Sequence, residues 1–163
     1  EIFPWAETDG AHLGIKMEDA ESHALTCTPD LYHVDPCYVE VKFDSRTPVM
    51  ATKENCQDAA EKTAHAHGFE FETPGMIPPH RVAADSAFVQ KLLHAYEHVT
   101  GLKGEAMAIG GGTYVHDIKN GVAFGAVLPG IDTHMHGADE FFDLENIVLD
   151  TKVYAEAIIE LCS

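Results

Sequence analysis

The sequence has few basic residues and lacks any long apolar run. Lysine and arginine together number 10, against 27 aspartate and glutamate residues, so the formal net charge is −17. Because such a surface repels phosphate backbones and anionic lipids, we expect neither a nucleic acid nor a membrane as partner. No apolar run approaches the roughly 20 residues that a membrane-spanning helix needs, and no signal peptide is visible. The hydrophobic fraction of 45% excludes a disordered chain.

The four cysteines lack the C-x-x-C spacing that is typical of structural zinc sites and redox pairs. They are Cys27, Cys37, Cys56 and Cys162. Cys27 and Cys37 fall on neighbouring predicted strands, so one alternative is that they face each other. The other alternative, which we favour, is a set of four reduced, half-buried thiols in a cytoplasmic protein.

The first half of the chain has the pattern of a small antiparallel sheet with a helix on one side. The turn signal Asp35-Pro36 joins two alternating segments, which predicts a β-hairpin. An alanine-rich segment with mixed charges then predicts a surface helix that ends at Gly68. The expected elements are strands over residues 24–34, 37–46 and 69–73 and a helix over residues 51–67, after a short helical end and a loop in residues 1–23. This β-β-α-β order is most of a ferredoxin-like α+β unit.

A proline-rich segment over residues 74–82 interrupts this pattern and predicts a domain boundary. Beyond it, the apolar spacing predicts an α/β layer. The expected elements are a helix that Asp85 caps and Gly101 ends, strands over residues 105–109 and 122–130, and a helix from Asp143 onward. The last helix is expected to bury the face formed by Leu144, Ile147, Val148, Thr151, Tyr154, Ala155, Ile158 and Leu161. Since a two-strand layer is too small to bury both faces of its strands, the sequence suggests part of a larger protein.

The segment DTHMHGADE, residues 132–140, combines two histidines with three carboxylates, which are ligands that suit zinc and related divalent ions. His134 and His136 would point the same way on a strand, whereas in a loop only one of them would point inward. The segment comes close to the H-x-H-x-D-H motif of metallo-β-lactamase-like hydrolases, but its acid is one position late and the third histidine is absent. From spacing alone, a metal site and a pair of surface histidines both remain open.

Two further patterns are candidates for substrate binding. Gly110, Gly111 and Gly112 follow an expected strand, so their backbone N–H groups could approach a ligand closely, although a tight bend also explains the run. Arg46 ends a strand, where its guanidinium could fork onto a substrate carboxylate. The alternative for Arg46 is a surface ion pair with Asp44 or a nearby glutamate.

Two histidine pairs on the predicted helices are weaker candidates. His65 and His67 are two apart near a helix end, which places them on different faces. His94 and His98 have the i, i+4 spacing of a chelating pair, but no third ligand follows in their helix. We interpret both pairs as solvated.

The order of the motifs carries more information than any one of them. S-R-x-P at residues 45–48 is followed by D-S-x-F-V-Q-x-L-x-x-A-Y-E-x-x-T-G at 85–101, I-G-G-G-T-Y at 109–114, D-T-x-x-H-x-x-D-E at 132–140 and Y-A-E-A-I at 154–158. This order resembles the C-terminal part of the PepV-like dinuclear-zinc dipeptidases, which are relatives of aminoacylase, carnosinase and the zinc carboxypeptidases. The similarity covers nearly the whole chain and is densest from residue 85 to 160.

The resemblance implies a catalytic α/β domain that is interrupted by a smaller lid domain. Residues 1–76 would be the later part of the lid, and residues 80–163 the C-terminal segment of the catalytic domain. In the family, two zinc ions, with cobalt or manganese as alternatives, activate the water that cleaves a dipeptide. By resemblance, His136 is the last metal ligand, the glycine run Gly110–Gly112 contacts the bound peptide, and Arg46 holds the substrate's C-terminal carboxylate.

The chain departs from the family pattern in two ways. Val115 and His116 stand where the family often has Ala-Arg, so the role of that arginine is missing here. The other metal ligands and the catalytic glutamate belong to an N-terminal half that the sequence lacks, so we expect no catalytic residue on this chain. We therefore predict a fragment of a cytoplasmic metallopeptidase that is inactive alone and whose partners are that half and a dipeptide. The alternatives are a non-catalytic lid-like module that binds peptide or dimerises, and a self-contained zinc hydrolase that uses His134, His136 and Asp139.

Overall fold

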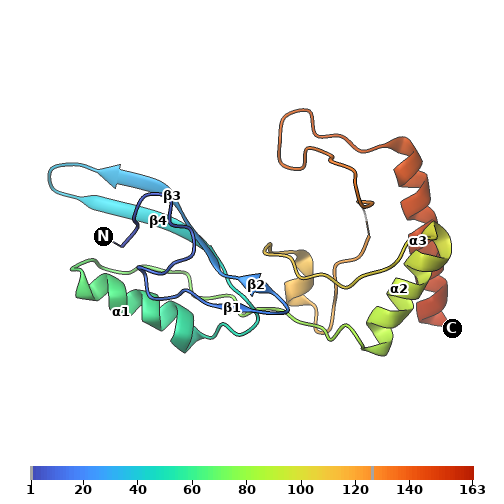
Figure 1. Cartoon of the computed structure of the whole chain (residues 1–163), viewed down its shortest axis with the longest axis horizontal. Helices are drawn as coiled ribbons and strands as arrows, with labels where there is room; N and C mark the ends of the chain where they lie inside the picture. The colour runs from blue at the N-terminus through green and yellow to red at the C-terminus, as the bar shows by residue number, and fades with distance from the viewer. Residues whose placement is uncertain (1, 126) are drawn as a thin grey trace. The chain divides into compact units, whose positions relative to one another are not determined.

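The computed structural model describes residues 2–125 and 127–163, which fold into two compact units (Figure 1). The first unit contains the chain up to Arg81 together with Ala108–Gly112, and the second contains Val82–Met107 and Thr113–Ser163. Each unit has a small hydrophobic core of its own. Within the described residues no helix is both long enough and apolar enough to cross a membrane.

The first unit is built on a long antiparallel hairpin, as the alternating pattern predicts (Figure 1). Its strands are β3 (Thr26–Val34) and β4 (Val39–Arg46). One extra residue bulges out of β3 between Pro29 and Leu31. A bulge is one of the few places where a strand accepts proline, because proline cannot donate a hydrogen bond to the ladder.

A helix packs against this hairpin, again as predicted. A single π-helical turn, η1 (Lys53–Gln57), continues directly into α1 (Asp58–Ala66). The start is a capping box, because the Thr52 hydroxyl accepts from the Asn55 N–H and the Asn55 side chain accepts from the Thr52 N–H. Gly68 follows the end with a φ of 82°. The buried core between hairpin and helix consists of Leu13, Ile15, Leu25, Cys27, Ala51, Cys56 and Ala60.

The N-terminal residues form turns where the sequence predicts a short helical end. Gly10 and Gly14 have φ angles of 67° and 80°, left-handed conformations that interrupt a helix. Leu13 lies between these glycines and Ile15 directly follows the second one. Their side chains are 2% and 1% exposed, so the segment contributes to the core. The elements that follow are the two-residue strands β1 (Glu18–Asp19) and β2 (His23–Ala24), which pair antiparallel.

Residues 69–73 do not form the predicted third strand of the first unit. Phe71 still packs on the core, with its ring centroid 6.3 Å from that of Phe43, while Phe69 is 42% exposed. The alternation therefore predicts the position of Phe71 correctly but not that of Phe69, which would lie on the same side of a strand. A strand also needs a paired neighbour, and the described strands pair only as β1 with β2 and β3 with β4.

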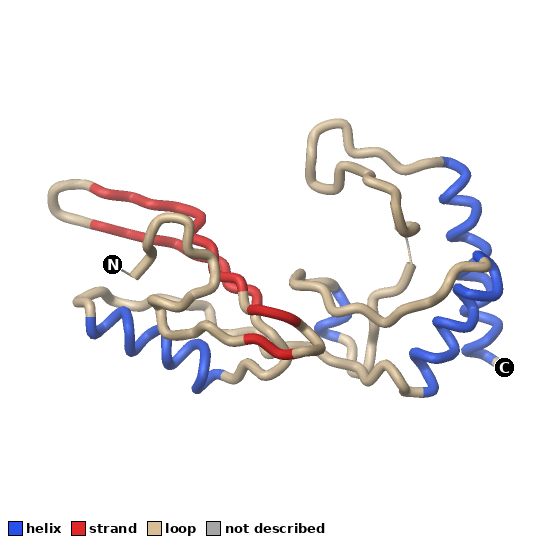
Figure 2. Tube along the Cα trace, viewed as in Figure 1, coloured by secondary structure: helices blue, strands red, loops and turns tan. Residues whose placement is uncertain are grey.

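The second unit is organised by two helices and long loops (Figure 2). Helix α2 (Ala87–Thr100) begins one residue later than predicted, because the Ser86 hydroxyl, and not Asp85, accepts the hydrogen bond from the Val89 N–H. It ends at Gly101, which has the left-handed conformation expected at that position. The remaining elements are the 3₁₀ turn η2 (Tyr114–Asp117) and α3 (Leu144–Cys162), which Asp143 caps as predicted.

Helices α2 and α3 pack antiparallel around a small apolar centre with polar pairs beside it. Ala95 and Ala157 are 0% and 4% exposed, so the two backbones approach closely between them. His94 contacts Glu160 at 2.7 Å and His98 contacts Glu156 at 2.9 Å. The later residue of α2 thus contacts the earlier residue of α3, which shows that the two helices run in opposite directions. The interface is therefore held by Leu92, Ala95 and Ala157 in its centre and by imidazole–carboxylate pairs at its border.

The predicted buried face of α3 is wrong. The structure buries Val153 and Ala157, whereas Leu144 and Ile158 are 78% and 63% exposed. The side of α3 that packs on α2 consists of Ala157 with Glu156 and Glu160 beside it, so the predicted face points away from α2. We call this uncovered side the α3 stripe; its large apolar residues are Leu144, Ile147, Val148, Tyr154, Ile158 and Leu161.

The two strands predicted for the second half are also not formed. Residues 105–109 and the described part of 122–130 have no strand pairing, and residue 126 lies outside the described residues. The second of these segments is instead fixed to α3, because the Tyr154 hydroxyl donates to the Phe124 carbonyl oxygen at 2.8 Å. Their rings meet edge to face at 5.9 Å. An apolar segment without sheet neighbours thus stays a loop.

The hairpin also excludes the suggested pairing of Cys27 with Cys37. Cys27 is buried in β3 opposite Ser45, whereas Cys37 is exposed in the turn that connects the strands. Several residues of extended strand separate them, at about 3.3 Å per residue, which is far beyond the reach of a disulfide. All four cysteines are free thiols.

We predict that the four thiols react in two classes. Burial raises the pKa of Cys27 to about 11 and also raises the pKa of Cys56, whereas Cys37 and Cys162 are exposed. At pH 8 a thiol reagent should therefore label two cysteines rapidly and the other two slowly, because thiolate is the reactive form. Peptide mapping of the labelled protein should find Cys37 and Cys162 in the rapid class, and all four should react rapidly in denaturant. Rapid labelling of Cys27 in the native protein would contradict the described core.

Candidate functional site

Arg46 lies at the C-terminal end of β4, as the sequence predicts. Its Nε donates to the Asp44 carboxylate at 2.5 Å, and both side chains are 50% exposed. The surface ion pair that competed with a substrate role is therefore present. It uses only one edge of the guanidinium, and among the described residues no other polar partner of Arg46 is found. The terminal amino groups are thus left to bind a carboxylate with two parallel hydrogen bonds.

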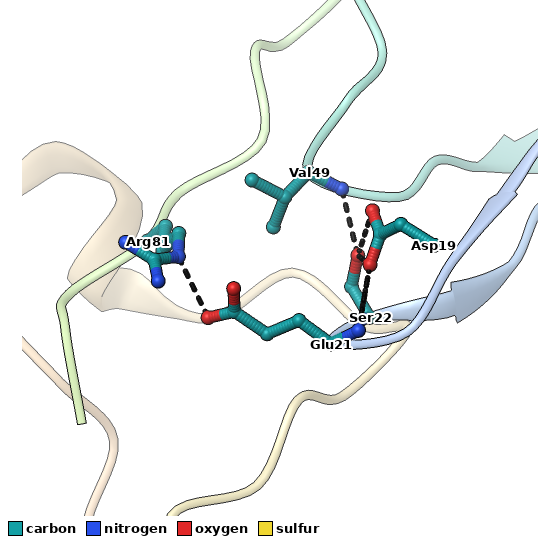
Figure 3. A network of polar contacts seen from close by, with 5 residues as sticks. All are labelled: Asp19, Glu21, Ser22, Val49 and Arg81. Carbon is teal, nitrogen blue, oxygen red and sulfur yellow. Dashed lines mark hydrogen bonds and ion pairs between the residues drawn. The ribbon is translucent and has the colours of Figure 1, made fainter.

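A network of hydrogen bonds fixes the backbone just beyond Arg46 (Figure 3). The Asp19 carboxylate accepts from the Ser22 N–H at 2.6 Å and from the Ser22 hydroxyl at 2.8 Å. The Ser22 oxygen in turn accepts from the Val49 N–H at 2.8 Å. Between Arg46 and Val49, Pro48 is fully buried. The turn between β1 and β2 thus fixes the end of β4, and a sequence scan misses this link because it joins residues far apart in the chain.

The same network changes the electrostatics of its carboxylate. Hydrogen bonds from the Ser22 backbone, then from its hydroxyl, lower the pKa of Asp19 below its ordinary value. These bonds stabilise the ionised form, which accepts but cannot donate. Nearby, Arg81 Nε donates to the Glu21 carboxylate at 2.6 Å, which ties the same turn to the proline-rich segment (Figure 3).

The glycine run lies beside Arg46 in the first unit. A Cβ built on Gly110 would lie 3.8 Å from the Arg46 Cβ, so two residues that the sequence separates by more than sixty positions are neighbours. A Cβ on Gly111 or Gly112 would meet no heavy atom within 4 Å. None of the three glycines has a positive φ, so neither backbone strain nor crowding within the described residues requires glycine here. The absence of side chains leaves their backbone N–H groups open to a ligand.

His134 and His136 lie in a turn and not on a strand. Their φ angles are 55° and 64°, and Asp139 in the same turn has a φ of 56°. Such left-handed conformations are uncommon for residues other than glycine, and they gather where a loop is held in an unusual shape. The His134 N–H donates to the Asp132 carboxylate at 2.9 Å, and its ring packs edge to face on Phe141.

The turn leaves His136 exposed, and its ring has no partner among the described residues. His134 is more constrained, because its ring contacts Phe141. The two histidines thus differ in their surroundings, which spacing alone could not show. His116, where the family pattern has arginine, lies at the end of η2, and its Nδ1 is 3.1 Å from the Thr113 carbonyl oxygen.

The donor set of the described residues does not complete a metal site. Imidazole at His136 has the right chemistry for zinc, cobalt or manganese. No group of three histidine, cysteine, aspartate or glutamate side chains is arranged to hold an ion in the parts of the chain that the structure covers. Since catalytic zinc takes about three protein ligands, the zinc site does not fit this chain alone. The self-contained site of His134, His136 and Asp139 has no geometric support.

Comparisons with known proteins agree with the order of the motifs. The sequence model of the family described as "Peptidase family M20/M25/M40" matches residues 5–160. The protein named "Putative dipeptidase YtjP" of Bacillus subtilis strain 168 is 35% identical over 156 residues, which are 95% of this chain and 33% of that protein.

Two staphylococcal relatives are similar over shorter stretches. "Putative dipeptidase SH1171" of Staphylococcus haemolyticus is 40% identical over 101 residues, which are 62% of this chain and 22% of that protein. "Putative dipeptidase SAUSA300_1697" of Staphylococcus aureus strain USA300 is 37% identical over 109 residues, which are 67% of this chain and 23% of that protein. The chain therefore spans about a third or less of the length of these relatives.

We expect the Asp19 network to make stability depend on pH. The folded-state pKa of Asp19 is lowered. Its contribution to the free energy of unfolding is therefore complete above the ordinary aspartate pKa of about 3.9, and it is lost as pH falls through the lower folded-state pKa. Asp19→Asn should therefore unfold at lower urea concentration than the wild type at pH 6, and the difference should shrink below about pH 4.

Asp30→Asn is the matched control, because Asp30 lies on the β3 bulge and is exposed. It should leave the unfolding midpoint nearly unchanged throughout this pH range. An Asp19→Asn midpoint equal to that of the wild type at pH 6 would show that the network does not hold the end of β4.

Proposed function

Because the chain belongs to the M20/M25/M40 peptidase family, we propose that it is part of a metal-dependent dipeptidase that hydrolyses the peptide bond of dipeptides. The observation that carries this proposal is the family match over residues 5–160 together with relatives that are named as dipeptidases. We further propose that residues 1–76 belong to a lid domain and residues 80–163 to the closing segment of the catalytic domain. A cytoplasmic location stays a prediction.

In this proposal Arg46 and the glycine run bind the substrate. The terminal amino groups of Arg46 hold the C-terminal carboxylate of the dipeptide by a forked pair of hydrogen bonds. The backbone N–H groups near Gly110 contact the peptide. Their closeness in the structure, 3.8 Å from a Cβ on Gly110 to the Arg46 Cβ, supports a shared role.

His136 supplies one metal ligand in this proposal. The ion would be zinc, with cobalt or manganese as alternatives, and when bound it would supply an activated water. The remaining ligands and the general base come from the region of the relatives that this chain does not cover, so we assign no catalytic step to the described residues. We propose for the same reason that the chain is inactive on its own.

The uncovered apolar surface supports the proposal that more sequence completes the domain. Six large apolar residues form the α3 stripe, and two apolar segments that have the pattern of strands remain unpaired. An exposed apolar face of this length is expected at an interface and not on a surface that faces solvent. In the proposal, strands from the uncovered region of the family domain pair with residues 105–109 and 122–125 and lie beneath the α3 stripe.

The proposal predicts different outcomes for the two histidines of the turn. Residues 1–163 should be grafted in place of the matching region of the Bacillus subtilis relative, and hydrolysis of a dipeptide measured with and without a chelator. The graft should show chelator-sensitive activity, and the 163-residue chain alone should show none. His136→Ala should reduce kcat/KM by at least about a hundredfold because a metal ligand is lost, whereas His134→Ala should change it less than about fivefold. Equal loss in both variants would contradict the assignment of His136.

A second prediction concerns Arg46 in the same graft. Arg46→Ala should raise KM about tenfold or more on a dipeptide with a free carboxylate, and Arg46→Lys should recover only part of this loss, because lysine cannot form the forked pair. On the C-terminally amidated dipeptide, Arg46→Ala and wild type should be nearly equal.

Lys42→Ala is the control for this prediction, since Lys42 lies on the same strand and pairs with Glu40 at 3.7 Å. It should behave as wild type on both substrates. An Arg46→Ala effect of the same size on the amidated and the free dipeptide would show that Arg46 does not bind the carboxylate.

A further inference from the structure

His94 and His98 of α2 lie outside the proposed substrate and metal site. They are four residues apart, so they lie one above the other on one side of the helix. Their rings stack almost parallel, with an interplanar angle of 13° and a centroid distance of 6.2 Å. Both side chains are well exposed, at 65% and 64%. Two imidazoles at this helical spacing are a recurring pair of transition-metal ligands.

The neighbouring helix fixes both rings by the same nitrogen. Nδ1 of His94 is 2.7 Å from the Glu160 carboxylate, and Nδ1 of His98 is 2.9 Å from the Glu156 carboxylate. An ionised carboxylate only accepts hydrogen bonds, so in each neutral ring the proton is on Nδ1 and the lone pair is on Nε2. A histidine that donates from one ring nitrogen to a carboxylate while its other nitrogen binds a metal is the usual arrangement at metal sites.

Both Nε2 atoms face away from α3, because both Nδ1 atoms face it. Two nitrogens that share one ion at metal–nitrogen distances of about 2.1 Å lie roughly 3 Å apart. The two rings, whose centroids are 6.2 Å apart, must therefore tilt toward each other while each Nδ1 keeps its contact with the glutamate. The described residues offer no ready group of three ligands. Water therefore completes the coordination, which predicts moderate affinity and weak selectivity.

We propose that His94 and His98 form a binding site for a divalent transition-metal ion, with Glu160 and Glu156 as positioning residues. This proposal does not rest on the proposed dipeptidase function. Because the ion would bind α2 while the same rings hold α3, metal binding stabilises the contact between the two helices. Affinity should follow the usual order, in which cobalt binds more weakly than nickel and nickel more weakly than copper.

The test is a calorimetric titration of the 163-residue chain with Ni²⁺ at pH 7.5. We expect one Ni²⁺ per chain at this site, and His94→Ala and His98→Ala should each lower its association constant about tenfold or more. Glu156→Gln and Glu160→Gln should each lower it by a smaller factor, because they remove only the hydrogen bond that orients a ligand. Saturating Ni²⁺ should raise the unfolding temperature of the wild type and leave that of the His94→Ala/His98→Ala double variant unchanged.

A matched histidine pair serves as the control. His65→Ala/His67→Ala should bind Ni²⁺ as the wild type does. Far-ultraviolet circular dichroism of each variant without metal checks that α2 and α3 are intact, and His94→Gln and His98→Gln replace any alanine variant that has lost helix. Unchanged Ni²⁺ affinity in the folded His94 and His98 variants, or loss of the binding in the His65/His67 variant, would overturn the proposal.

Discussion

A strand needs a neighbour for its backbone N–H and C=O groups, and this requirement decides which apolar segments of the chain become strands. The hairpin of β3 and β4 satisfies it locally, because a short turn brings the partner back along the same stretch of chain. Residues 69–73, 105–109 and 122–125 have suitable side chains but no paired neighbour in the described structure. They stay irregular, although Phe71 and Phe124 still pack on their cores.

Helix α3 packs only a narrow apolar strip against α2. Ala157 lies in the core with Leu92 and Ala95 of α2, and Glu156 and Glu160 bind the α2 histidines beside it. The α3 stripe is left exposed. The helical period thus identifies the apolar face of α3. It does not identify the partner of that face, which is not found among the described residues.

Local chemistry was readable from the sequence, and long-range contacts were not. The hairpin turn, the α1 segment with Gly68 at its end, the Gly101 stop and the Asp143 cap each depend on a few adjacent residues, and each is confirmed. The contact of Gly110 with Arg46 and the bond from Val49 to Ser22 join distant segments, so no spacing rule predicts them. His136 was chosen over His134 by family resemblance, and that choice stays a prediction.

Hydrogen exchange tests most directly whether the chain's unpaired apolar segments are strands that await a neighbour. Amide exchange at residues 105–109 and 122–125 should be measured in the 163-residue chain and in the chain grafted in place of the matching region of the Bacillus subtilis relative. If these segments belong to a larger sheet, their amides should exchange rapidly in the chain alone and be strongly protected in the grafted protein. Equally rapid exchange in both proteins would contradict the claim that these segments are strands of a larger sheet, because no partner strand would then have formed.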